Sequence, residues 1–451
     1  MTKSLKSWWD RFLFLDRGIL PTKRLIILLL ILSIGFFLSL SKLSWELMIG
    51  LNLFMIIGSL VDLLFSPNKK QLAAKRKLQA EIERGLPTSI DIEVTNHSTF
   101  GLSYRLIDGI PGSFTQPFLI SGRISGETTS RITYVTRAME RGDYQMNKIY
   151  FRYKSYLGLW EKQFTFTISN EVKVIPDLSE TRQYLENAQK FLLYEGVKIR
   201  KQQTGAGEFS KIRSYVVGDD PRTINWRQTA KLQEVMTNEY EPEHGKYITI
   251  LLDCGRMMGA ELKKGNRLER AMESAITVAT AALQNGDYVS FLAFSTDVKV
   301  FVPAGKGMAH LQTILHAIYS VKVDAAESNY GAVLSYLETM QKKRSLLLLF
   351  SDIHTFLREE SMLIYLRKLR QRHYFLMVGI QDATLNKRID ENPTTVQSAM
   401  LKSMAQQQML VKKKEKQKWE KQGLMMVEAD EDKLAITAVS YYINIMNRNL
   451  L

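Results

Sequence analysis

The stretches KYITILLD (residues 246–253) and SLLLLFSD (residues 345–352) decide the fold of the largest part of this chain. Each is an apolar run that ends in an aspartate, a pattern typical of a strand buried on both faces of a sheet. Amphipathic helical patterns alternate with such runs, as in NRLERAMESAITVATAALQ (residues 266–284). This alternation predicts a mostly parallel sheet, covered by helices on both faces, over residues 246–451.

The two aspartates that end these strands, Asp253 and Asp352, are the candidate metal ligands of the chain. In a parallel sheet, ligands bind at the carboxyl ends of the strands, so both carboxylates are expected at one edge. Mg²⁺ prefers hard oxygen ligands, and the hydroxyl of Ser328 in ESNYGAVL can add one. The alternative is that the two carboxylates accept hydrogen bonds from loop amides and hold no ion.

Residues 87–176 have a different pattern, in which apolar and polar residues alternate with period two between Gly, Pro, Asn and Ser turns. Runs such as SIDIEVTN (residues 89–96) and KIYFRYKS (residues 148–155) predict an antiparallel β-sandwich. The charged stretch before it, residues 66–86, is expected to be a basic helical stalk. Residues 177–245 are expected to form a linker helix and a separate segment before the α/β domain.

Two apolar runs near the N-terminus, residues 25–40 and 47–65, predict a two-helix transmembrane hairpin over residues 25–65. As helix, this stretch spans roughly 60 Å, which is about two crossings of a ~30 Å hydrocarbon core. Basic residues cluster before the first run, in residues 1–24, and after the second, whereas Lys42 alone lies between the runs. The positive-inside rule therefore places both flanks, and the bulk of the chain, in the cytosol. The expected location is the inner membrane of a bacterium. A cleaved signal peptide followed by a stop-transfer span is the rival interpretation, and it leaves the bulk cytosolic.

The formal net charge of +15 admits either anionic lipid headgroups or nucleic acid as a partner. No zinc-finger spacing, phosphate-binding loop or RNA-binding signature accompanies the charge, so membrane lipid is the expected partner and nucleic acid is not. The single cysteine, Cys254, cannot form an internal disulfide, which fits a reducing compartment.

The segment GEFSKIRSYVVGDDPRTINWRQTAK (residues 207–231) resembles domain-of-unknown-function family 58. The positions that carry the resemblance are Gly207, Phe209, Arg213, Tyr215, Gly218, Asp219, Asp220, Arg222, Ile224, Trp226, Thr229 and Ala230. The resemblance implies a von Willebrand factor A-like fold for residues 246–451 and an association with MoxR-type AAA+ ATPases. It also implies a metal-ion-dependent adhesion site of the form Asp-x-Ser-x-Ser, with a later Thr and a later Asp.

This chain departs from that metal-site pattern, because Gly255 and Met257 stand at the two serine positions. Glycine offers no side-chain oxygen and a thioether is a poor ligand for Mg²⁺, so the resemblance implies a degenerate site of Asp253, Ser328 and Asp352. For the segment itself, one hypothesis is an ion-pair network of Arg213, Asp219, Asp220 and Arg222, with Ile224 and Trp226 clamping the segment on the sheet. A partner-binding surface is the second hypothesis, since Arg, Trp and Tyr favour interface hot spots.

The function expected from these observations is a non-enzymatic, membrane-anchored scaffold or adaptor that acts with an AAA+ ATPase in the assembly or maturation of other proteins. Two alternatives remain at this stage: a metal-assisted hydrolase that uses the strand-end carboxylates, and a basic nucleic-acid-binding membrane protein.

Overall fold

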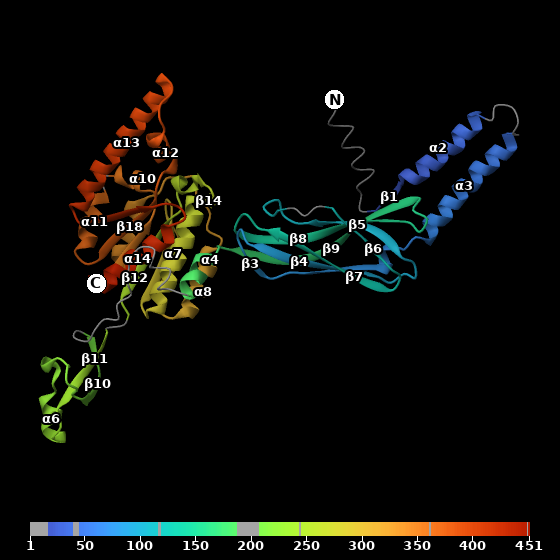
Figure 1. The fold of residues 1–451 in the computed structure, drawn as a ribbon. Coiled ribbons are helices and arrows are strands. Elements are labelled where there is room, and N and C mark those ends of the chain that lie inside the picture. The colour runs from blue at the N-terminus through green and yellow to red at the C-terminus, as the bar shows by residue number, and fades with distance from the viewer. Residues whose placement is uncertain are drawn as a thin grey trace. The chain divides into compact units, whose positions relative to one another are not determined.

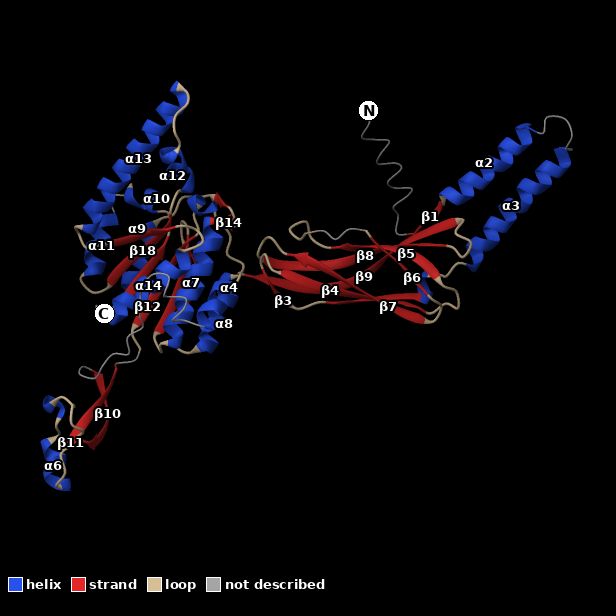
Figure 2. Ribbon diagram, viewed as in Figure 1, coloured by secondary structure: helices blue, strands red, loops and turns tan. Residues whose placement is uncertain are grey.

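The computed structural model describes residues 17–38, 45–115, 119–186, 207–242, 245–359, 362–448 and 450–451 (Figure 1). The chain divides into two compact units, Met1–Ile175 and Pro176–Leu451. Helices and sheets occur in both units, as Figure 2 shows by colour. The predicted multidomain, mixed helix and sheet architecture is therefore confirmed.

Two apolar helices, α2 (Lys23–Leu38) and α3 (Trp45–Phe65), lie side by side in the N-terminal unit (Figure 1). Within the described residues, one helical span, Ile49–Gln71, is long and apolar enough to cross a membrane. Helix α2 has 16 residues. The segment between the two helices, residues 39–44, lies outside the described residues.

Two sheets of the same unit pack around a common apolar core. The smaller has the order β2-β4-β7 and the larger the order β1-β9-β8-β5-β6, with β3 added beside β9. Period-two burial along β4 and β5 puts Ile90, Ile92, Val94, Tyr104 and Leu106 inside, as expected for a sandwich. The strands are β1 (Arg17–Pro21), β2 (Leu72–Lys77), β3 (Glu81–Glu83), β4 (Pro87–Asn96), β5 (Leu102–Gly109), β6 (Ile120–Ile124), β7 (Thr128–Arg137), β8 (Gly142–Lys154) and β9 (Trp160–Ile175).

The helical stalk expected at residues 66–86 is wrong, because this stretch contributes β2 and β3 to the sandwich. Its basic run is compatible with a strand since Arg76 points inward and forms a fully buried ion pair with Asp108 of the facing sheet. Tyr134 also donates to Asp108, at 2.6 Å, and the Arg76 guanidinium donates to the Met146 carbonyl at 2.8 Å. A buried arginine is tolerated only with such partners. The charge of Arg76 predicts an exposed position, and that prediction fails because the partners come from distant strands.

The sandwich is bonded to the ends of both apolar helices. Strand β1, which lies in the basic N-terminal segment (residues 1–24), pairs with β9, and Thr22 donates to the Gly158 carbonyl at 2.7 Å just before α2 begins. Near the end of α3, the buried Asp62 carboxylate accepts bonds from the Ser155 hydroxyl at 2.5 Å and the Leu157 amide at 2.8 Å. Both helices therefore have one end fixed at the same turn of the sandwich.

The C-terminal unit is built on a six-stranded sheet of order β16-β15-β12-β17-β18-β19, in which only the edge strand β16 is antiparallel. The strands are β12 (Tyr247–Asp253), β15 (Tyr288–Phe294), β16 (Val298–Gly305), β17 (Ser345–Phe350), β18 (Tyr374–Ile380) and β19 (Met425–Ala429). In chain order this is a 3-2-1-4-5-6 arrangement, the doubly wound order. It places the ends of β12 and β17 side by side.

Helices cover both faces of this sheet, and the two faces take alternate strand residues. Ile248, Ile250 and Leu252 face the core under α7 (Arg267–Gln284), α8 (Met308–Ile318) and α14 (Leu434–Asn447). Leu251 faces the core under α9 (Tyr330–Met340), α10 (Ile353–Leu357), α11 (Met362–Arg370) and α13 (Val396–Glu420). The unit also contains α4 (Ser179–Glu186), which contacts α7, and α12 (Ala383–Asp390) beside α13.

The segment that resembles the family folds as a module, here called the signature hairpin and defined as residues 207–242. It consists of the antiparallel strands β10 (Gly207–Ser214) and β11 (Met236–Pro242), joined by a 3₁₀ turn (Pro221–Thr223) and the short helix α6 (Trp226–Leu232).

Candidate functional site

The Asp253 carboxylate lies at the carboxyl end of the central strand β12 and is 2% exposed. One oxygen accepts from the Gly255 amide at 2.8 Å and from the Ser328 hydroxyl. The other accepts from the Tyr330 hydroxyl at 2.9 Å and from the Ser351 hydroxyl. A carboxylate has about four lone-pair positions, so protein donors fill the coordination capacity of Asp253.

Asp352 follows β17 and has a different set of partners. One oxygen pairs with the Arg267 guanidinium, in an ion pair whose side chains are 13% and 8% exposed. The other caps helix α10 by accepting from the Thr355 amide at 2.9 Å and the Thr355 hydroxyl at 2.8 Å. The cation that Asp352 contacts is therefore supplied by the chain itself, from the first residue of α7.

Gly255 is what allows Ser328 to approach Asp253. A Cβ atom built on Gly255 would lie 2.0 Å from the Ser328 hydroxyl oxygen and 3.1 Å from the Ser328 amide nitrogen. Any side chain at position 255 would thus displace Ser328. The glycine that breaks the Asp-x-Ser-x-Ser pattern belongs to a closed arrangement of hydroxyl groups around the carboxylate.

The three predicted ligands are only partly brought together. Asp253 and Ser328 are hydrogen-bonded, whereas Asp352 is turned to Arg267 and to its own helix cap. Across the described part of the chain, no group of three or more His, Cys, Asp or Glu side chains is arranged to hold a metal ion. The donor set around Asp253 and the guanidinium on Asp352 do not fit a Mg²⁺ ion, which needs about six oxygen ligands.

The protonation of Tyr330 and His354 limits the acid–base chemistry that this edge can perform. Burial, and the negative charge of Asp253, raise the pKa of the Tyr330 hydroxyl well above its ordinary value, so Tyr330 remains a neutral donor. His354, in α10, has its pKa lowered by burial and by Arg358, and its ring nitrogen lies 3.5 Å from the Arg358 guanidinium. Among the described residues, the His354 ring therefore contacts an arginine and no serine or cysteine nucleophile.

Sequence reasoning did not identify Arg267, Tyr330 or Ser351 as members of this cluster. Ser351 could have been found, because it stands one residue before Asp352 and the parallel pairing of β12 with β17 sets it beside Asp253. Tyr330 stands two residues after Ser328 at the start of α9. Arg267 has no such signal, since a basic residue at a helix N-terminus opposes the helix dipole and is not expected there.

The signature hairpin is held by an internal ion pair. Arg213 donates to both Asp219 oxygens, each at 2.8 Å, and the Val216 amide donates to the same carboxylate at 2.9 Å. The ion pair lowers the pKa of Asp219, with the Val216 amide as a second cause. Tyr215 closes the turn by donating to the Asp219 carbonyl at 3.1 Å. The predicted network thus includes Arg213 and Asp219.

The other predicted members have separate roles. Asp220 caps the 3₁₀ turn by accepting from the Arg222 amide at 2.9 Å, which is a backbone contact. Gly218 has φ of +114°, a conformation that disfavours any side chain. The backbones of Gly207 and Phe209 lie in β10, but the Phe209 side chain lies outside the described residues.

The clamp of Trp226 on the sheet stays a prediction, because the position of the signature hairpin relative to the sheet is not determined (Figure 1). The Trp226 side chain is 69% exposed, although it begins α6. Val217, at the opposite turn, is 97% exposed, and Val216, Leu232 and Val235 are exposed as well. Exposed apolar side chains on a module stiffened by an internal ion pair are features of a protein-binding surface.

Comparison with known proteins places the signature hairpin and most of the sheet in one family. Residues 211–418 match the family described as "Protein of unknown function DUF58". The chain is also 21% identical over 292 residues to "Uncharacterized protein YeaD" of Bacillus subtilis (strain 168), which covers 63% of this chain and 70% of that protein.

Among solved structures, BatB from Bacteroides thetaiotaomicron, a conserved hypothetical protein, has a TM-score of 0.31 and 13% identity, covering 45% of this chain and 100% of that one. A FixG-related protein from Vibrio parahaemolyticus has a TM-score of 0.17 and 8% identity, covering 23% of this chain and 96% of that one. The family match covers residues 211–418, and it confirms the predicted resemblance to DUF58 for that part of the chain.

Proposed function

We propose that this protein is a membrane-anchored scaffold that binds other proteins through its DUF58 region and needs no metal ion to do so. The observation that carries the proposal is the signature hairpin, which presents Trp226 and Val217 to solvent on a module stiffened by the Arg213–Asp219 ion pair. Tryptophan in a rigid frame is the residue type most enriched at interface hot spots.

The α/β unit is proposed to be a von Willebrand factor A-like domain. Its 3-2-1-4-5-6 strand order and the aspartate at the end of the first strand support this. In place of a metal-ion-dependent adhesion site it has the closed cluster of Asp253, Ser328, Tyr330 and Ser351, with Arg267 on Asp352. Partner binding at this edge would then use protein groups alone.

Helices α2 and α3 are proposed to form a transmembrane hairpin in a bacterial inner membrane, with the bulk of the chain in the cytosol. The apolar span Ile49–Gln71 and the exposed apolar surfaces of both helices support the anchor. The basic flanks support the orientation. The proposed partner, a MoxR-type AAA+ ATPase, follows from the family resemblance.

Affinity purification of the full chain from detergent-solubilised membranes, with and without ATP, tests this function. We expect wild type to recover a MoxR-type ATPase, and the double variant Val217→Ser, Trp226→Ala to lose it. Ile364→Ser is the matched control, because Ile364 is 73% exposed on α11, outside the signature hairpin. Recovery of no AAA+ ATPase from wild type under either condition would overturn the proposed partner.

A further inference from the structure

A cleft of about 580 Å³ lies where helix α2 joins the sandwich. Its walls come from the start of α2 and from strands β5, β6, β8 and β9. The charged side chains on its lining are Lys23, Arg24, Arg105, Arg152, Lys154 and Glu161. Five basic groups and one carboxylate thus face a single opening, which makes the cleft strongly attractive to anions.

Three of these cations have their charge available for a ligand. Arg105 is paired with Glu161, and Arg152 donates to the Gln163 side chain. Lys23, Arg24 and Lys154 are exposed and make no hydrogen bond or ion pair with any residue that the structure describes. The positive charge in the cleft is therefore uncompensated by the described protein.

The start of α2 is a second, independent source of positive potential. The N-terminus of a helix carries about half a positive charge and favours acidic residues in the first turn. Helix α2 has no acidic residue there and begins with Lys23 and Arg24 instead. Two cations at the positive end of a dipole repel it, and an anion bound in the cleft would relieve that repulsion.

The cleft lies where the sandwich is bonded to the start of α2 and the end of α3. Lys162 donates to the Leu63 carbonyl at 3.1 Å and the Ser66 carbonyl at 3.2 Å, at the end of α3. Asp62 binds the turn that follows β8, and Thr22 binds the same turn beside α2. If α2 and α3 cross a bilayer, the cleft opens at the level of the phospholipid headgroups.

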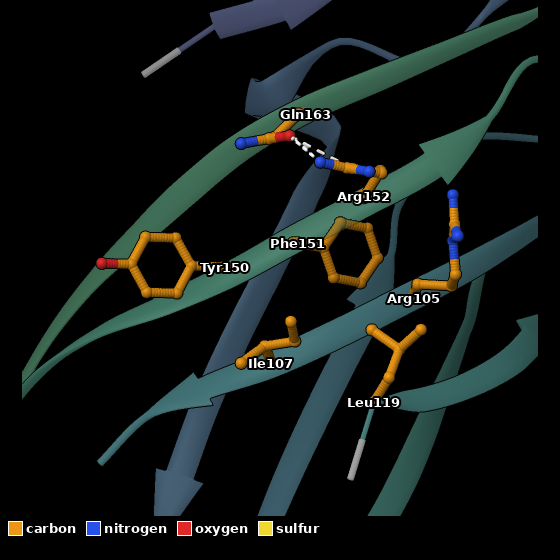
Figure 3. A pocket seen from close by; sticks show the side chains of 7 residues that line it. All are labelled: Arg105, Ile107, Leu119, Tyr150, Phe151, Arg152 and Gln163. Atoms are coloured by element: carbon orange, nitrogen blue, oxygen red, sulfur yellow. Dashed lines mark hydrogen bonds between the residues drawn. The ribbon is translucent and has the colours of Figure 1, made fainter. Parts of the chain in front are cut away.

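The basic surface of the cleft is bounded on one side. Along β5 and β8 it ends at an apolar pocket of about 490 Å³, which shares Arg105 and Arg152 with the cleft. Figure 3 shows Tyr150 and Ile107 at the far end of this pocket, away from the two arginines. A polynucleotide needs a continuous basic track, and this apolar boundary interrupts such a track along β5 and β8, which favours a compact anion.

We infer that this cleft binds the headgroup of an anionic phospholipid from the leaflet facing the sandwich. Lys23, Arg24 and Lys154 contact the phosphate, and Arg105 and Arg152 form the inner wall. The bound lipid holds the sandwich against the membrane in one orientation. This inference rests on the proposed transmembrane hairpin and adds a lipid-binding site to it.

Native mass spectrometry of the full chain in dodecyl maltoside tests the inference, with phosphatidylglycerol and phosphatidylcholine of identical acyl chains as probes. We expect wild type to prefer phosphatidylglycerol, and Lys154→Glu to reduce that preference at least about tenfold, since each basic group at a membrane surface contributes about fivefold. Lys148→Glu is the matched control, because Lys148 is an exposed lysine of the same strand outside the cleft. Equal binding of both lipids by wild type, or equal losses in the two variants, would overturn the inference.

Two further experiments test the lipid site and the membrane anchor separately. Displacement of phosphatidylglycerol by micromolar glycerol 3-phosphate would assign the cleft to a soluble phosphate and contradict the lipid. Alkaline carbonate extraction of membranes tests the anchor alone, and extraction of the chain would contradict the proposed hairpin. A chain that resists extraction and shows no lipid preference would contradict the lipid site only.

Discussion

Arg267 and Asp352 form a buried ion pair at the edge of the sheet where the sequence predicts a divalent cation. Asp352 also caps α10, and Arg267 begins α7, so the pair links two helices from opposite faces of the sheet. The guanidinium neutralises the second strand-end carboxylate, and hydroxyl donors satisfy the first. The proposed scaffold is independent of metal ions because of this arrangement.

Removal of the guanidinium should destabilise the C-terminal unit. We expect Arg267→Ala to lower its free energy of unfolding by about 3 kcal/mol, because breaking a buried pair leaves an uncompensated charge. Thermal unfolding of the detergent-solubilised full chain measures this as a lower Tm. Arg256→Ala is the control, since Arg256 pairs with Glu327 in an exposed ion pair and should have little effect. Equal Tm values for the two variants would contradict the role of Arg267.

A side chain at position 255 should disrupt the hydroxyl cluster. Gly255→Ala places a methyl group 2.0 Å from the Ser328 hydroxyl oxygen, so we expect a loss of about 1–3 kcal/mol as Ser328 is displaced from Asp253. Gly112→Ala is the matched control, because a Cβ atom there has no neighbour within 4 Å. A neutral effect of Gly255→Ala on Tm would show that the contact is not required.

The sequence predicts most of the fold. Where the prediction is wrong, the error has a physical reason. Apolar runs such as KYITILLD specify buried parallel strands because both faces of each strand need apolar contacts. The basic run containing Arg76 predicts an exposed helix, since nothing local indicates that Asp108 of a distant strand neutralises the arginine. For Trp226 the sequence allows either a clamp on the sheet or a partner-binding surface, and the structure shows the side chain 69% exposed.

The candidate site was less predictable than the fold. The sequence indicates that Asp253 and Asp352 share an edge, because the carboxyl ends of parallel strands lie at the same edge of a sheet. It does not indicate where each carboxylate is directed, which depends on long-range partners. Arg267 approaches Asp352 because α7 packs across the sheet, where it contacts β12, β15 and β18, and no local pattern in the sequence encodes that contact.

Stability should depend on pH through Glu180 in α4. Burial raises its pKa to about 7, with the nearby Arg270 opposing that effect, and its side chain is 28% exposed. A carboxyl group whose pKa is higher in the folded state favours folding below its ordinary value near 4.5, and this contribution is lost as the pH rises through about 7. We therefore expect Glu180→Gln to raise the Tm relative to wild type at pH 8.5. At pH 5 the increase in Tm should be smaller.

Glu186→Gln is the control for this comparison, because Glu186 is exposed on the same helix. Its Tm difference from wild type should be small at both pH values. A Glu180→Gln difference that does not change with pH would contradict a raised pKa for Glu180.

The proposed topology predicts labelling from opposite sides of the membrane. In a Cys254→Ala background, a cysteine replacing Lys42 should react with a membrane-impermeant maleimide in intact spheroplasts. A cysteine replacing Lys148, exposed on the sandwich, should react only after permeabilisation. Labelling of the Lys148 position in intact spheroplasts would reverse the proposed orientation.

Calorimetric titration of Mg²⁺ into the full chain tests the central claim most directly. The four donors on Asp253 and the guanidinium on Asp352 predict no saturable heat up to millimolar Mg²⁺. A saturable heat that disappears in both Asp253→Ala and Asp352→Ala would show that the edge of the sheet binds the ion, and it would contradict a metal-independent scaffold.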